Sequence, residues 1–160
     1  MPRSERLCKR PKTRADPDKI VAFGKVVGGG RAPMVWIGGG AVDAGPDILA
    51  LAEKIGAPVV SFRMGKGVVD SRHPLSLTTV AGIKLYNRTD QLIGIGTRID
   101  VPVASWEPAP AGRKLARVDI DQAAIQRVPV QVPYVVDGAP EPTGPHRSIL
   151  SADQPCWRTS

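Results

Sequence analysis

The 160-residue chain is poor in aromatic side chains and in cysteine, and it has no long apolar run. Aromatic residues make up 4% of the sequence, so a core must be built mainly from Val, Ile, Leu and Ala. No stretch of 18 consecutive apolar residues occurs, so we expect no membrane-spanning helix. Cys8 and Cys156 stand near opposite ends without metal-ligand spacing. We therefore expect neither a disulfide framework nor a zinc site, and a cytoplasmic location.

The positive charge is concentrated at the start of the chain. The formal net charge is +7, and residues 1–14 carry +5 of it, which leaves +2 for the other 146 residues. We expect residues 1–16 to be a disordered basic arm. A nucleic-acid-binding arm is the alternative, although no aromatic side chains alternate with the charges to stack on bases. The proline-rich residues 137–160 are expected to be a disordered tail.

Short apolar runs alternate with helical patterns through the middle of the chain. Buried strands are predicted at residues 34–37, 57–62, 91–95, 115–120 and 130–136. Helices are predicted at residues 17–27, 46–55, 79–87 and 123–127. Pro133 assigns the last strand to a sheet edge, because proline cannot donate to a ladder. The alternation predicts an α/β fold, with a doubly wound, mainly parallel sheet and helices on both faces.

The glycines Gly38, Gly39 and Gly40 follow the first predicted strand and precede a helix. In such a sheet, ligands bind beyond the carboxyl ends of the strands, and glycines there let a phosphate approach the backbone. The third glycine of a GxGxxG pattern is displaced to Gly45, which disfavours an ordinary NAD site. The favoured alternative is a tight strand-to-helix turn.

Two further candidate groups follow later strands. Gly96, Thr97 and Arg98 come directly after a strand, and the planar guanidinium of Arg98 is suited to pair with a phosphate. Asp119 and Asp121 flank Ile120 at the end of another strand, where carboxylates accept hydrogen bonds from ribose hydroxyls. The alternative for this pair is structural, with Asp121 capping the following helix.

The sequence offers little else for chemistry. Lys66 in a glycine loop is expected to be solvated, and His73 before Pro74 is expected to be a turn residue. Neither a nucleophile with a base beside it nor a cluster of metal ligands is recognisable, so no catalytic residue and no metal site are predicted.

The motifs, taken in order, resemble the central domain of thiamine diphosphate-dependent enzymes of the acetolactate synthase type. The matching segments are APMVWIGGGAVDAG, LAEKIGAPVVSFRMGKGVVDSRHPLSL, QLIGIGTRID followed by Trp106, and RVDIDQAAIQR. They lie within residues 17–136, which we interpret as one central domain. The resemblance implies a Rossmann-like domain that lies between a pyrimidine-binding and a diphosphate-binding domain in the family.

The resemblance also implies cofactors. Full-length members use thiamine diphosphate and magnesium, and some central domains bind FAD or an ADP-like ligand. Gly38–Gly40 would approach the phosphates or the ribityl chain of the flavin, Gly96–Arg98 its phosphate segment, and Asp119 and Asp121 the adenosine end. The groups that hold and activate thiamine diphosphate belong to the flanking domains, so this chain alone is expected not to bind it.

We therefore interpret the chain as the central cofactor-scaffold domain, or a fragment, of an acetolactate synthase-like enzyme that is inactive alone. The full-length parent would decarboxylate and ligate 2-oxo acids, with the two flanking domains as partners and no membrane. A truncated or frameshifted gene is one hypothesis for its ends. The alternative function is a free-standing FAD- or ADP-binding domain.

Overall fold

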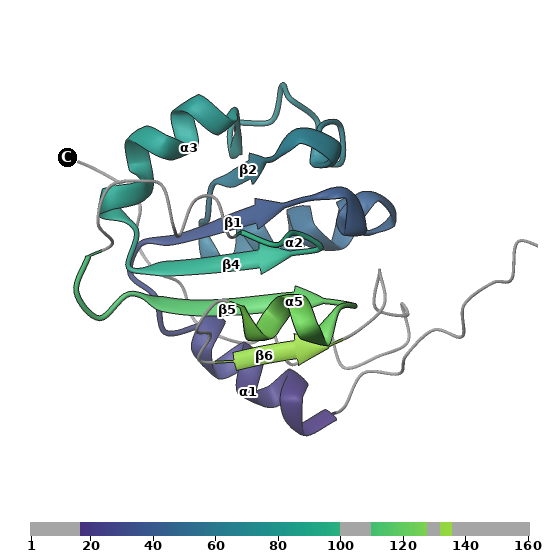
Figure 1. Cartoon of the computed structure of the whole chain (residues 1–160). Helices are drawn as coiled ribbons and strands as arrows, with labels where there is room; N and C mark the ends of the chain where they lie inside the picture. Colours follow the sequence, from purple (N-terminus) through teal and green to yellow (C-terminus); the bar gives the residue numbers. More distant parts are fainter. Residues whose placement is uncertain (1–16, 100–109, 128–131, 136–160) are drawn as a thin grey trace, which may run out of the picture.

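The computed structural model describes residues 17–99, 110–127 and 132–135 (Figure 1). The predicted basic arm and the proline-rich tail lie outside these residues. The six strands form one sheet in the order β3-β2-β1-β4-β5-β6, and every pairing is parallel. The strands are β1 (Pro33–Ile37), β2 (Val59–Ser61), β3 (Ser76–Leu77), β4 (Gln91–Ile95), β5 (Lys114–Asp119) and β6 (Val132–Val135).

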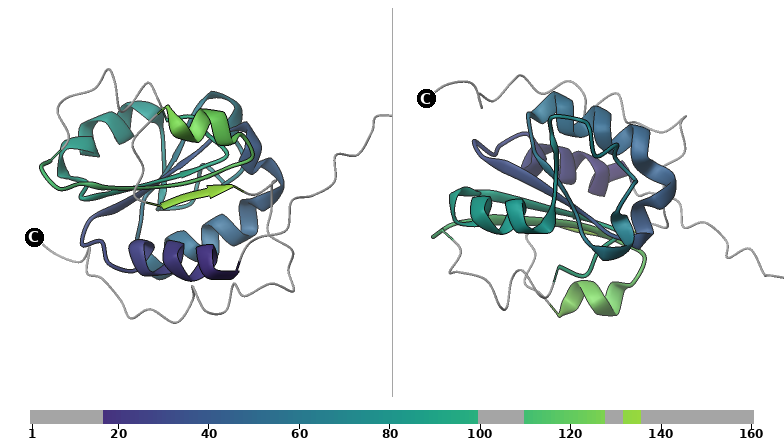
Figure 2. Two further views of the ribbon diagram at one scale, coloured as in Figure 1. Left: turned by 60° about the horizontal axis from the view of Figure 1, so that its bottom comes forward. Right: turned by 90° about the horizontal axis from the view of Figure 1, so that it is seen from above.

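Helices cover both faces of the sheet. Figure 2 shows α1 (Pro17–Val27) and α2 (Gly45–Ile55) on one face, and α3 (Thr79–Leu85) and α5 (Gln122–Gln126) on the other. Parallel strands need crossover connections, and right-handed crossovers that wind in two directions from β1 place helices on both sides. The predicted doubly wound α/β fold is confirmed.

Each face of the sheet has its own apolar core. On the α1 and α2 face, Val35, Ile37 and Ile93 pack against Phe23 and Ile48 from the two helices. On the opposite face the core comprises Met34, Trp36, Val60, Tyr86, Leu92, Ile99 and Leu115. Alternate residues of β1 point to alternate faces, and both sets are buried, which explains the continuous apolar run of this strand.

The helix ends carry local stop and start signals. Pro46 lies in the first turn of α2, where its missing N–H costs nothing. Gly56 ends this helix in the left-handed conformation at φ 63°, and its N–H donates to the carbonyls of Ala52 and Glu53. Thr78 caps α3 by accepting a hydrogen bond from the N–H of Ala81 at 3.3 Å.

The structure differs from the predicted elements in several short segments. The helix predicted at 79–87 is α3 to Leu85, followed by a 3₁₀ helix, η3 (Tyr86–Arg88). Another 3₁₀ helix, η1 (Gly39–Ala44), fills the predicted turn before α2, and a third, η2 (Arg63–Gly65), follows β2. The short strand β3 pairs with β2 at the sheet edge, and two residues give no recognisable periodicity. Strand β2 is also shorter than the predicted 57–62, whereas β6 lies at the other edge as predicted from Pro133.

No helix in the described part of the chain is long and apolar enough to cross a membrane.

The burial of a side chain predicts how much stability its replacement by alanine removes. Ile48 of α2 is 3% exposed and Ile83 of α3 is 43% exposed, so the same substitution to alanine can be compared in two helices. We expect Ile48→Ala to lower the free energy of unfolding by about 2–5 kcal/mol, because it removes buried methyl groups and leaves a cavity. Ile83→Ala should cost less than about 1 kcal/mol. Chemical denaturation measures both, and equal losses would contradict the described burial.

Candidate functional site at the carboxyl edge of the sheet

The candidate residues gather at the carboxyl ends of three adjacent strands. In the sheet, β4 lies between β1 and β5, and Ile37, Ile95 and Val118 lie in register across the three. The direction of winding reverses between β1 and β4, and a crevice for ligands forms at such a point. The segments 38–40, 96–98 and 119–121 leave the sheet here. The structure therefore brings all three predicted groups to one edge.

The glycine loops after β1 and β4 lie so close together that their backbones form hydrogen bonds with each other. The N–H of Gly38 donates to the carbonyl of Ile95 at 3.2 Å, and the N–H of Gly40 donates to that of Gly96 at 3.1 Å. A Cβ on Gly38 would lie 2.5 Å from the Gly96 oxygen, and one on Gly96 would lie 2.6 Å from the Ala41 nitrogen. Gly96 also has φ +59°. Close loop packing therefore accounts for these three glycines.

The close packing limits which amides can reach a ligand. The N–H groups of Gly38 and Gly40 already donate to carbonyls, and the N–H of Ala41 donates to the carbonyl of Gly38. Gly39 and Gly40 are both exposed, but a Cβ on Gly40 would lie 2.9 Å from the Gly96 Cα, whereas one on Gly39 would meet only the Met64 side chain, at 3.1 Å. Gly39 is thus the one of the three where a ligand can approach the backbone.

A neighbouring turn after β2 supports the same loops. Gly65 of η2 lies under the end of β1, where an added Cβ would stand 2.5 Å from the Ile37 carbonyl oxygen. Arg63 begins this turn with φ +38°, and its guanidinium lies 5.5 Å from the centre of the Phe62 ring. Met64 is 78% exposed beside Gly39. The sequence analysis noted the MGKG loop but did not identify this supporting role.

The turn after β4 folds back onto the sheet. Thr97 is buried, Arg98 is exposed, and Ile99 is buried again over Gly94. Ile99 has φ +46°, which is strained for a β-branched residue and costs about 1–3 kcal/mol. The Ile99 side chain is buried in the space that Gly94 leaves open because it has no side chain, and this burial offsets the cost. The fold-back leaves Arg98 facing solvent at the edge.

Asp119 and Asp121 each have a structural partner. Asp119 is buried and accepts a hydrogen bond from Nη2 of Arg117 at 2.6 Å. Asp121 caps α5, because its Oδ1 accepts from the N–H of Ala124 at 3.1 Å. The capping alternative is confirmed for Asp121, and a ribose role for either residue stays a prediction. The sequence analysis missed Arg117, although an arginine inside the apolar strand pattern LARVDI was a visible signal.

The other singled-out residues lie apart from these contacts. Lys66 is exposed, as predicted. His73 is a turn residue, with its Nδ1 accepting from the N–H of Leu75 at 3.3 Å and its Nε2 lying 3.3 Å from Glu53 of α2. No group of three or more His, Cys, Asp or Glu side chains among the described residues could hold a metal ion.

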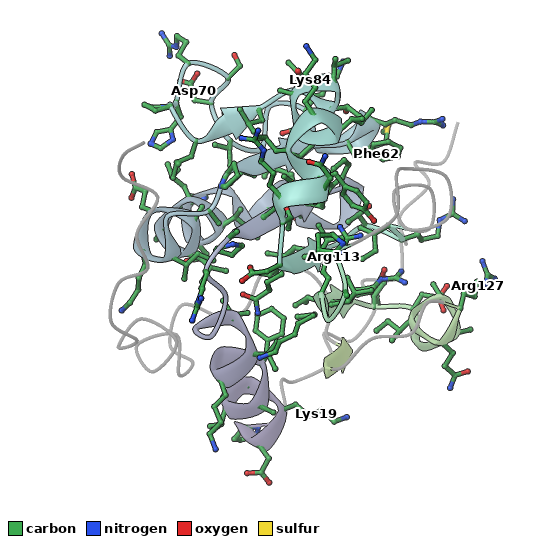
Figure 3. All side chains as sticks on the ribbon, turned by 90° about the vertical axis from the view of Figure 1, so that its left-hand side faces the viewer. Lys19, Phe62, Asp70, Lys84, Arg113 and Arg127 are labelled. Atoms are coloured by element: carbon green, nitrogen blue, oxygen red, sulfur yellow. The ribbon has the colours of Figure 1, made fainter. Side chains whose placement is uncertain are left out.

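Arg113 and Tyr86, whose pKa values are shifted, form a separate structural pair near the amino edge of the sheet, which faces the viewer in Figure 3. The guanidinium of Arg113, which precedes β5, lies 3.9 Å from the centre of the Tyr86 ring. Burial lowers the pKa of Arg113, and burial also raises the pKa of the Tyr86 phenol, against the opposing effect of the Arg113 charge. This pair follows α3 and precedes β5, opposite the glycine loops.

Comparison with known proteins adds the family. The model for "Thiamine pyrophosphate enzyme, central domain" matches residues 25–140, which include all three candidate groups. The chain belongs to this family.

Curated relatives of the central domain are acetolactate synthases. The enzyme of Arthrospira platensis is 32% identical over 141 residues, covering 80% of this chain and 24% of that protein. The large subunit from Corynebacterium glutamicum is 32% identical over 138 residues, covering 80% of this chain and 22% of that protein. The chain is thus a central domain of the acetolactate synthase-like, thiamine diphosphate-dependent type, and it spans about a quarter of the length of these relatives.

Solved structures show the same fold. Benzoylformate decarboxylase from Polynucleobacter necessarius superimposes with a TM-score of 0.65 at 23% identity, covering 79% of this chain and 26% of that one. A Mycobacterium smegmatis protein described as a thiamin diphosphate-dependent enzyme gives 0.70 at 20% identity, covering 92% and 30%. At these identities the comparison supports the architecture of the central domain.

The contact between the glycine loops can be tested with a matched pair of glycines. Gly96 and Gly112 both have positive φ, and an added Cβ would meet backbone at Gly96 but nothing within 4 Å at Gly112. Gly112→Ala should cost about 1–2 kcal/mol from the left-handed backbone alone. Gly96→Ala should cost a further 1–3 kcal/mol or so, because the two loops must separate. Thermal or denaturant unfolding measures the difference, and equal costs would show that the loops tolerate a methyl group.

Proposed function

We propose that this chain is the cofactor-scaffold domain of a larger acetolactate synthase-like enzyme, with residues 17–136 as the domain. The family match over residues 25–140, with relatives about four times longer, carries the proposal. The reaction of the whole enzyme would be decarboxylation of a 2-oxo acid and ligation to a second one. Pyrimidine-binding and diphosphate-binding domains would be its partners. A cytoplasmic location is part of the proposal, because Cys8 and Cys156 form no pattern typical of a disulfide framework or a zinc site.

Thiamine diphosphate and magnesium would be held by the partner domains. Magnesium prefers carboxylate oxygens, and the described residues contain no cluster of carboxylates that fits it. When bound, thiamine diphosphate supplies the carbanion chemistry of the whole enzyme. The residues of this chain would contribute rigidity and a surface, and none of them is proposed to be catalytic.

A dinucleotide such as FAD, or ADP, is the ligand that the carboxyl edge fits. The exposed Gly39 admits a phosphate or ribityl chain close to the backbone, and the exposed Arg98 offers two parallel donors to a phosphate. Asp121, the N-cap of α5 just after β5, is exposed and offers an acceptor to a ribose hydroxyl. Gly38, Gly40, Gly96 and Thr97 would shape this edge from within. A free-standing FAD- or ADP-binding domain is the second candidate function, because this edge needs no other domain to form.

Ligand binding to the purified chain tests the proposal. We expect ADP and FAD to compete for one site in calorimetry, and we expect no turnover of pyruvate with thiamine diphosphate and magnesium. Arg98→Gln should weaken ADP binding about tenfold, because a charge-assisted contact to phosphate is lost.

Arg88→Gln is the matched control, since Arg88 is also exposed but follows α3 and precedes β4 at the opposite edge. Equal losses for both variants would indicate non-specific attraction of the anion. Turnover of pyruvate by the chain alone would contradict the assignment of catalysis to the partner domains.

A further inference from the structure

A fully buried arginine lies beneath the carboxyl edge. Arg117 of β5 is 0% exposed, on the sheet face that α5 covers. Its neighbour in register on β4 is Gly94, over which Ile99 packs. A buried guanidinium is costly unless its donors are paired. The Nε of Arg117 has no partner among the described residues, so the two Nη groups show what the side chain holds in place.

The partners of Arg117 form a closed ring. Its Nη2 donates to Oδ2 of Asp119 at 2.6 Å, and Oδ1 of Asp119 accepts from the N–H of Asp121 at 3.1 Å. Oδ1 of Asp121 accepts from the N–H of Ala124 at 3.1 Å, and the carbonyl of Ala124 accepts from Nη1 of Arg117 at 2.8 Å. The ring therefore joins the end of β5 to helix α5 through four hydrogen bonds.

The two aspartates differ in how many of their carboxylate oxygens the ring uses. Both oxygens of Asp119 accept a bond within the ring, and the residue is buried. Asp121 is exposed and uses Oδ1 in the ring, while its Oδ2 accepts no hydrogen bond from any described residue. A ligand at this edge would therefore meet Asp121, in an orientation that its cap to α5 fixes.

We propose that Arg117 is a positioning residue that acts through this ring to orient Asp121 toward the ribose of an adenine nucleotide. The role rests on the proposed nucleotide-binding function. Asp119 relays the position of the guanidinium to the backbone of Asp121 and does not itself touch the ligand. The family resemblance placed both aspartates near the cofactor. In this proposal Asp121 contacts the ligand and Asp119 supports Asp121.

The chemistry of the ring needs an arginine. The planar guanidinium donates from Nη1 and Nη2 in fixed directions, one toward α5 and one toward Asp119. A lysine at this position keeps the charge but has one nitrogen, which cannot hold both acceptors in the same geometry. Arg117→Lys therefore opens the ring while it leaves the buried charge of Asp119 compensated.

The experiment combines ADP binding with amide hydrogen exchange on the full chain. Arg117→Lys should weaken ADP binding about threefold to tenfold and speed exchange of the Asp121 and Ala124 amides about tenfold, as expected for loss of about one hydrogen bond. Asp119→Asn, a second variant that opens the ring, should give the same pattern. Asp121→Asn should weaken ADP binding about tenfold, and adding Arg117→Lys to it should weaken binding little further, since both act through one carboxylate.

Arg113→Lys is the control for stability alone, because Arg113 is a half-buried arginine that stacks on Tyr86 at the opposite edge. It should lower the melting temperature without changing ADP affinity or the two amides. Normal ADP affinity in both Arg117→Lys and Asp119→Asn would overturn the positioning role. If the unsubstituted chain bound neither ADP nor FAD, the proposed nucleotide-binding function would fail, and with it the ligand role of Asp121. Unchanged exchange of both amides in Arg117→Lys would overturn the ring itself.

Discussion

The close approach of the loops after β1 and β4 is the constraint on which the edge depends. Where the winding of a parallel sheet reverses, the loops after two neighbouring strands run to opposite faces of the sheet and leave a crevice between them. Here the backbone of Gly40 donates to the carbonyl of Gly96, and neither residue could carry a side chain at that distance. The loops at residues 38–40 and 96–98 therefore form one closely packed layer where the winding reverses between β1 and β4.

That layer positions the surrounding turns. Because the 3₁₀ helix η1 starts at Gly39, the chain completes its turn before α2 begins at Gly45, and η2 packs against it from the next strand. On the other side, the fold-back of Ile99 over Gly94 sends Arg98 outward. The strain at Ile99 persists because the packing around it overdetermines its conformation.

The sequence predicted those features whose signal is local. Apolar runs located β1, β4 and β5, and a helical pattern at 46–55 located α2, because periodicity acts within a few residues. β3 was missed because two residues have no period, and the ring around Arg117 was missed because its members meet only after the strand and helix have folded. The placement of candidate groups followed from topology, since strands that are parallel bring their carboxyl ends together.

Two of the three glycines after β1 serve loop packing, which leaves less open backbone than an ordinary phosphate-binding loop has. In a phosphate-binding turn the glycine amides stay open for the ligand, whereas the amides of Gly38 and Gly40 are already satisfied by carbonyls of the neighbouring loop. The ligand binding that we propose for this edge would then depend more on side chains. The fold-back of Ile99 leaves Arg98 exposed, and the ring that begins at Arg117 fixes the position of Asp121. Close backbone packing with a few outward side chains suits the scaffold role that we propose, because such an edge would position a ligand without supplying a reactive group.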